Sequence, residues 1–112
     1  VHCAVALRYE DRGAGAPVVL ARGADRVAAR IREAAEASGV AVVSSPRLAR
    51  AIYFSTRIEA QIPSGLYPAV AQVLAYVFHL RNYRRAGGSV PVLPPDLPVP
   101  EGMDRPPRSY AR

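Results

Sequence analysis

The stretch that decides the fold is residues 17–44, which read PVVLARGADRVAARIREAAEASGVAVVS. It opens with a strand-like apolar run over 17–22, continues with helix-forming residues to about Ser38, and closes with the apolar run 40–44. Gly39 is a typical C-terminal stop for the helix. A strand, a helix and a second strand in this order predict a βαβ unit, whose strands are parallel and joined by a right-handed crossover.

The helix in this stretch has one apolar stripe. Charged Arg and Glu residues fill most of the remaining positions, so that part of the helix is expected to face water. The stripe itself recurs at helical spacing and is expected to pack on the sheet; it consists of Val27, Ile31, Ala34 and Ala35.

A further strand-like run precedes this unit. It covers residues 3–9 and is followed by the polar, glycine-containing connection 10–16. Because that connection is short, we expect 3–9 and 17–22 to pair antiparallel. The strand-type residues begin at Val1, so the chain opens within a strand, and we expect its partner strand to lie upstream.

A short helix is expected next. Ser45 and Pro46 are typical of an N-cap and a first helical position, and the helix is predicted to run to about Phe54. Its inward-facing residues are expected to be Leu48, Ala51 and Ile52.

The last helix is the longest one predicted. It is expected to begin between Pro63 and Pro68 and to end near Tyr83. Pro68 is placed in its first turn, because a proline deeper in a helix costs about 3 kcal/mol. The apolar stripe of this helix is predicted to be Val70, Val73, Leu74, Val77 and Leu80.

The chain changes character after Gly88. Seven of the eleven prolines lie between Val90 and Arg112, which excludes a helix or a central strand there. We therefore divide the chain into a domain, 1–86, and a Pro-rich flexible tail, 87–112. The fold class predicted is α/β: a small mixed sheet, with three strands here and a fourth upstream of residue 1, packed with helices.

Composition limits the class of protein. With 112 residues, half of them hydrophobic, the chain has room for one modest core. No apolar run approaches the roughly 18–20 residues that span a bilayer. The lone Cys3 cannot form an internal disulfide, which fits a reducing compartment. The net charge of +6 suits nucleic acid, anionic lipid or an acidic protein as a partner, or simply a solvated surface.

Several motifs, in order, resemble one known family. They are AVALRY (4–9), APVVLARGAD (16–25), RIRE (30–33), LARAIY (48–53) and IP…LY…AVAQVLAYV (62–77), followed by LPVPE (97–101). The chain resembles the C-terminal cytoplasmic domain of the type III secretion export-switch family (FlhB/YscU type), in its flagellar branch.

The resemblance implies a membrane-bound parent protein. Members of the family carry four transmembrane helices before this domain and sit in the inner-membrane export gate, so the domain would lie on the cytoplasmic face of the bacterial inner membrane. Partners implied are that transmembrane part, the upstream strand, other export-gate components and the export substrates. Family members cleave themselves once between Asn and Pro in an Asn-Pro-Thr-His loop and then switch from rod and hook substrates to filament substrates.

Val1 and His2 align with the Thr-His of that loop. In the cleavage the Asn amide attacks its own carbonyl and forms a succinimide, which requires a strained turn but no external nucleophile. The attacking Asn would lie upstream, so no catalytic residue is expected in this chain. Val1 stands where the family usually has Thr, and Cys3 where it often has an aromatic residue.

The family's second site binds substrates. Early substrates, namely rod and hook subunits and the hook-length control protein, carry a short hydrophobic export signal that docks on this domain. The resemblance places the matching positions at Ala16, Pro17, Ala71 and Leu74. Ala71 and Leu74 share a helix face, and three small residues would leave a shallow apolar cleft. Taken without the family, the same four residues are typical of an ordinary core.

Other candidate sites have less support. His2 and Cys3 are neighbours in a strand and point to opposite faces, so they cannot act as a nucleophile and base. Two His and one Cys without ligand spacing predict no metal site, and nothing predicts a cofactor. His79 and the run 81–85 suit the C-terminal end of a helix.

Alternatives to the flagellar interpretation stay open. One is an injectisome homologue or a stand-alone paralogue of the same family. Another is a small Arg-rich nucleic-acid-binding module, which would group its arginines on one face with interleaved aromatics. The arginines here are instead spread among Glu and Asp, so no nucleic acid is expected as a partner.

Overall fold

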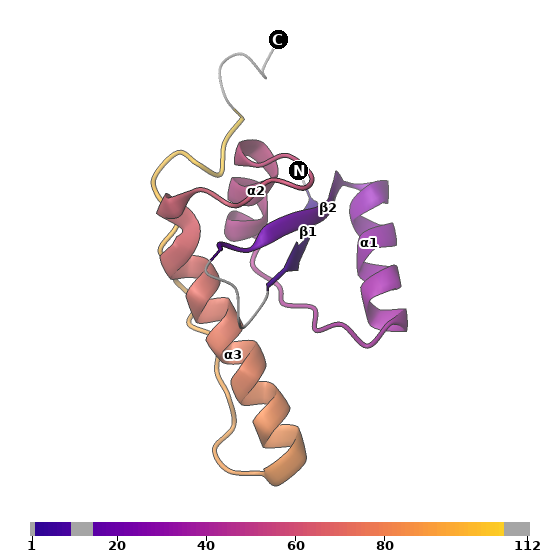
Figure 1. Cartoon of the computed structure of the whole chain (residues 1–112), viewed down its shortest axis with the longest axis vertical. Helices are drawn as coiled ribbons and strands as arrows, with labels where there is room; N and C mark the ends of the chain where they lie inside the picture. The colour runs from indigo at the N-terminus through magenta and orange to yellow at the C-terminus, as the bar shows by residue number, and fades with distance from the viewer. Residues whose placement is uncertain (1, 10–14, 107–112) are drawn as a thin grey trace.

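The structure, a computed structural model, describes residues 2–9 and 15–106. A small sheet lies at the centre, with α1 on one side and α2 and α3 on the other (Figure 1). The elements in chain order are β1 (Cys3–Arg8), β2 (Val18–Ala24), α1 (Arg26–Ala37), α2 (Pro46–Ser55), the 3₁₀ helix η1 (Ser64–Leu66) and α3 (Tyr67–Ala86).

Strands β1 and β2 pair antiparallel, which confirms the short-connection argument. The register runs from Cys3 opposite Ala24 to Arg8 opposite Val18. It is irregular between Ala6 and Leu7, where β2 carries one extra residue. That extra residue is Leu20, whose side chain is exposed, as is common at a bulge.

The third strand predicted over 40–44 is wrong. In the described part of the chain the sheet has two strands, and residues 40–44 belong to neither. No backbone hydrogen bond joins Ala41–Ser44 to another described segment. A strand exists only through the hydrogen bonds of a neighbouring strand, and none is in reach here. The βαβ unit and the mixed sheet are therefore absent among the described residues, although the α/β class is correct.

The predicted stripe of α1 is partly wrong. Ala28 is buried, and Ile31 and Ala35 are half-buried, whereas Val27 and Ala34 are exposed. The helix is rotated because the chain passes from β2 into α1 through Asp25, whose φ of 53° makes a sharp turn. That turn brings Val27 over the backbone of Gly23.

Replacing Gly23 by Ala is expected to lower the free energy of unfolding by about 1–3 kcal/mol, the usual cost of overpacking. A Cβ at Gly23 would lie 2.1 Å from Cγ1 and 2.6 Å from Cβ of Val27, so α1 would have to shift away from β2. Urea unfolding followed by circular dichroism measures the loss. Adding Val27→Ala should restore part of it.

The matched control is Gly65→Ala, whose Cβ would meet only Pro100 Cγ at 3.4 Å and Met103 Sδ at 3.9 Å. It is expected to leave stability unchanged or to raise it slightly. Equal losses in the two variants would contradict the close packing of α1 on β2.

Helices α2 and α3 follow the predictions more closely. Leu48, Ala51 and Ile52 are buried, as expected for the inner face of α2. Pro68 lies in the first turn of α3, also as expected, and the helix continues to Ala86 before Gly87 ends it at a φ of 74°. The core that these helices share consists of Val19, Leu48, Ala51, Ile52, Ile62, Leu66, Ala69, Val70, Leu97 and Val99.

The segment after α3 is extended and turns back along that helix (Figure 1). Proline keeps it out of helix and strand, as predicted. It is nevertheless packed, because Leu97 and Val99 belong to the buried core. The division between 1–86 and 87–112 stays a prediction, and α3 ends at its boundary.

Candidate functional site

Helix α3 carries the predicted docking residues on one face. Ala71 is exposed, and Leu74, one turn further, is half-buried against the core. Phe78 continues the same face one turn beyond Leu74 and is partly exposed. This face therefore carries a small exposed residue, a leucine that packs partly on the core, and an aromatic ring.

The other two predicted residues precede β2. Pro17 is buried, and its carbonyl accepts a hydrogen bond from the Ile62 N–H at 3.0 Å. The next residues are also fixed, since the Val19 N–H donates to the Ala60 carbonyl at 3.0 Å. Ala16 is half-buried and packs against the same core cluster as Leu74. The start of β2 is thus held rigidly beside the core.

An aromatic pair joins the end of β1 to this face of α3. The ring of Tyr9, just after β1, lies 6.5 Å from that of Phe78, centroid to centroid. The guanidinium of Arg81 lies 6.0 Å from the Phe78 centroid, within reach of a cation–π contact. Tyr9 therefore lies against the α3 face that carries Ala71 and Leu74, one turn beyond Leu74. Sequence reasoning missed Tyr9 and Phe78, because their contact depends on the tertiary fold.

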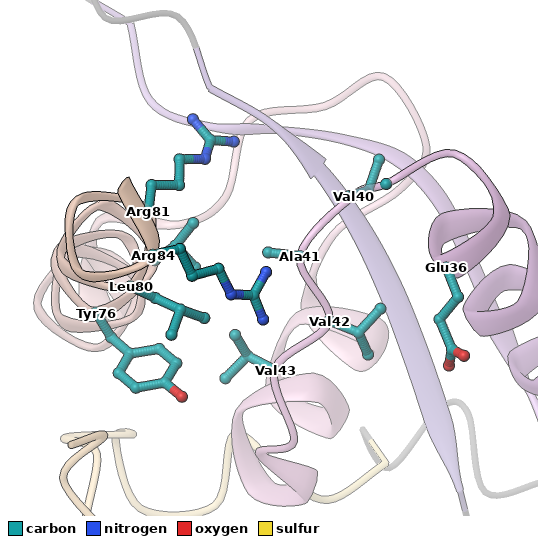
Figure 2. Close-up of a pocket in the computed structure, with 11 residues that line it drawn as sticks. Glu36, Val40, Ala41, Val42, Val43, Tyr76, Leu80, Arg81 and Arg84 are labelled. Carbon is teal, nitrogen blue, oxygen red and sulfur yellow. The ribbon is translucent and has the colours of Figure 1, made fainter. Parts of the chain in front are cut away.

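A groove lies on a different face of α3. It has a volume of about 580 Å³ and lies between the extended segment Val40–Val43 and the second half of α3. Figure 2 shows Arg84 pointing across this groove toward Ala41 and Val43, over a floor that includes Leu80 and Tyr76. Nothing in the sequence indicates this groove, since residues 40–44 were predicted to form a strand of the sheet.

His2 and Cys3 do not form a reactive pair. Val1 lies outside the described residues. His2 is exposed, and its carbonyl accepts a hydrogen bond from the Asp25 N–H at 2.7 Å. Burial raises the pKa of the Cys3 thiol, which disfavours the thiolate that a nucleophile requires.

The remaining polar candidates are structural. The Nε2 atom of His79 lies 3.1 Å from the Ser89 carbonyl oxygen and so contacts the segment after α3.

Within the described ranges, no group of three or more His, Cys, Asp or Glu side chains could hold a metal ion. In those same ranges no helix has the length and apolar character needed to cross a membrane.

Comparison with known proteins decides the family. The family model described as "FlhB HrpN YscU SpaS Family" matches residues 1–77. The chain belongs to this family. FlhB HrpN YscU SpaS proteins serve flagellar and type III protein export, so the resemblance noted from the sequence motifs is confirmed.

Curated relatives are flagellar. The "Flagellar biosynthetic protein FlhB" of Escherichia coli K12 is 50% identical over 103 residues, which cover 92% of this chain and 27% of that protein. The protein of the same name from Salmonella typhimurium is 48% identical over 103 residues, again 92% of this chain and 27% of that protein. The chain thus spans about a quarter of the length of these relatives.

Solved structures share the fold. The cytoplasmic domain of FlhB from Shewanella putrefaciens matches with a TM-score of 0.83 and 51% identity, over 91% of this chain and 80% of that one. The PscU C-terminal domain matches with a TM-score of 0.65 and 33% identity, over 68% of this chain and 96% of that one. The chain is similar to FlhB-type C-terminal domains, and it is more similar to this flagellar example than to PscU.

Proposed function

We propose that this domain docks early export substrates of the flagellar apparatus on the apolar surface formed by Ala16, Pro17, Ala71 and Leu74. Those substrates would be rod and hook subunits and the hook-length control protein. The observation that supports the proposal is the packing of Ala16 and Leu74 against one core cluster, with Ala71 exposed on the same helix face as Leu74. The domain would act at the cytoplasmic face of the bacterial inner membrane, together with the membrane part of its parent protein and other export-gate components.

The size of the side chains suits transient capture. Three of the four residues are Ala or Pro, which leaves room for one or two apolar side chains of an incoming signal. Burying one such side chain gives about 1.5–3 kcal/mol. Association costs several kcal/mol in lost freedom, so the expected binding is weak and reversible. Weak capture suits a protein that must release each substrate for export.

The switch to filament substrates would follow self-cleavage of the parent protein at an Asn-Pro bond upstream of Val1. That step is intramolecular and occurs once, so the domain turns over no small molecule. Its role after cleavage would be to hold the upstream strand while it presents the docking surface. The edge of β1 that does not pair with β2 supports this role.

Leu74→Asp is expected to weaken binding of a purified rod or hook subunit at least tenfold, equivalent to about 1.4 kcal/mol. The carboxylate would place a charge in the middle of an apolar contact, where it cannot keep its hydration. Isothermal titration calorimetry with the folded domain measures the change.

The matched control is Gln72→Asp, which places the same charge at an exposed position of α3 in the same turn but on another face of the helix. It is expected to change the affinity less than about twofold. Circular dichroism should show that both variants keep their helix content. Unchanged binding by Leu74→Asp would remove the proposed surface.

A further inference from the structure

Residues 97–104 occupy a cleft beside the start of α3. Leu97 and Val99 are each 7% exposed, and they belong to the same buried cluster as Leu48, Ile52 and Leu66 of α2 and η1. Pro100 and Met103 pass over Gly65, where a Cβ would lie 3.4 Å and 3.9 Å from their Cγ and Sδ atoms. Apolar side chains of the segment therefore fill a cleft whose walls are α2 and η1.

Two arginines of α2 fix the polar part of the segment. Arg47 Nη2 donates a hydrogen bond to the Val99 carbonyl at 2.9 Å. The Asp104 carboxylate lies 3.9 Å from Arg47 Nε and 3.7 Å from Arg50 Nη2. Arg47 and Arg50 are three residues apart on α2 and so share a face. The cleft thus recognises a carbonyl and a carboxylate at a fixed spacing.

The other main-chain hydrogen bonds of the segment join residues within it. The Val99 N–H donates to the Leu97 carbonyl at 2.8 Å, and the Met103 N–H to the Pro100 carbonyl at 3.2 Å. Among the described residues, the Val99 carbonyl is the main-chain group of 97–104 that bonds to the rest of the domain. A strand of the sheet is held by a ladder of main-chain bonds, whereas this segment is held by side chains, as a bound peptide is.

The connection to this segment alternates between exposed and packed residues: Pro91 is buried and Leu93 packs against the core. Val90 is 66% exposed and Val92 is 80% exposed, although both are apolar. Because the segment is covalently attached, its effective concentration at the cleft is high, and even a weak ligand stays bound.

We propose that the cleft between α2 and η1 is a peptide-binding site, which the chain's own residues 97–104 occupy in this structure. Its ligands are extended segments of other proteins with the pattern apolar–Pro–apolar–Pro and an acidic residue five positions after the second apolar one. Leu97 and Val99 supply the template for the apolar positions and Asp104 for the acidic one. The proposal stands apart from substrate docking at Ala16 and Leu74, because it concerns a different surface.

Exchange in a nicked chain tests the proposal. A site-specific protease sequence is inserted between Gly88 and Ser89 of the full chain, and the folded protein is cut there. A fluorescent peptide of residues 93–106 is then added in excess, and its binding is followed by anisotropy. We expect saturable binding, release of the resident fragment on a sizing column, and an unchanged circular dichroism spectrum.

Peptide variants distinguish specific recognition from non-specific hydrophobic binding. The peptide with Leu97→Ser and Val99→Ser is expected to bind at least tenfold more weakly. The peptide with Asp104→Asn should bind about two- to threefold more weakly, because its ion pairs are partly exposed. The proposal is overturned if the labelled peptide does not enter the nicked chain, if release of the fragment unfolds the domain, or if the double-Ser peptide binds equally well.

Discussion

Leu66→Ala is expected to lower the free energy of unfolding by about 2–5 kcal/mol, the range for a leucine deleted from a packed core. Leu66 is 0% exposed and lies in η1, where it joins the core residues of α2 and α3. The truncation leaves a cavity that the surrounding helices cannot fully close. For a domain of about this size, each kcal/mol corresponds to roughly 4–8 °C in Tm, so a drop of at least about 8 °C is expected.

Leu20→Ala is the matched control for this prediction. It makes the same chemical change at a leucine that is 45% exposed at the bulge of β2. Its cost is expected to stay below about 1 kcal/mol, because surface substitutions rarely exceed that. Guanidinium unfolding of the unmodified domain and of the two variants measures both losses in the free energy of unfolding. If the Leu66 variant lost no more than the Leu20 variant, the core would not be centred on η1.

Local sequence signals predicted the elements that depend on local physics. The hairpin of β1 and β2 followed from two apolar runs and a short polar connection. The inner face of α2 followed from the spacing of Leu48, Ala51 and Ile52, and all three are buried. Pro68 marked the first turn of α3, since proline is tolerated there and costly further along.

The predictions were wrong where tertiary contacts determine the local structure or the burial of a residue. Residues 40–44 have strand composition, but a strand requires a neighbour, which the local sequence cannot supply. The alanine-rich α1 has several nearly equivalent apolar stripes, and the close approach of Val27 to Gly23 selected another one. The prolines excluded a helix after Gly88 but gave no sign that Leu97 and Val99 would be buried.

The candidate site depended even more on information beyond local pattern. Ala16, Pro17, Ala71 and Leu74 came from the family resemblance, since alone they look like core residues. The Tyr9–Phe78 contact beside Leu74 links residues far apart in the chain. The periodicity of the sequence could not indicate the groove beside 40–44, because it predicted these residues as a strand within the sheet.

A peptide copying the segment that precedes residue 1 in the parent protein is expected to raise the Tm of the domain by about 10 °C. At a concentration one hundredfold above its Kd, a ligand stabilises the folded state by about 2.7 kcal/mol. The stabilisation would come from main-chain hydrogen bonds that the domain now lacks. A scrambled peptide of equal composition is the control, and thermal unfolding by circular dichroism measures the shift. No shift above the control would contradict the proposed strand partner.

Two features of the structure make room for such a strand. In the described part of the chain, β1 pairs with β2 on one edge and with no strand on the other. Val40 and Val42 are 58% and 46% exposed, an unfavourable state for β-branched residues in an extended segment. A strand that paired with β1 and with 40–44 would join both edges into one sheet.

Amide hydrogen exchange locates the added strand. The amides of Ala41, Val42 and Val43 have no hydrogen-bond acceptor among the described residues, so they should exchange quickly in the isolated domain. With the peptide bound, we expect alternate amides of this segment to exchange at least tenfold more slowly, because a strand presents every second N–H to each neighbour. A Tm rise without protection at these amides would mean that the peptide pairs with β1 alone. Protection there together with the Tm rise would mean that residues 40–44 become a strand only when the upstream segment is present.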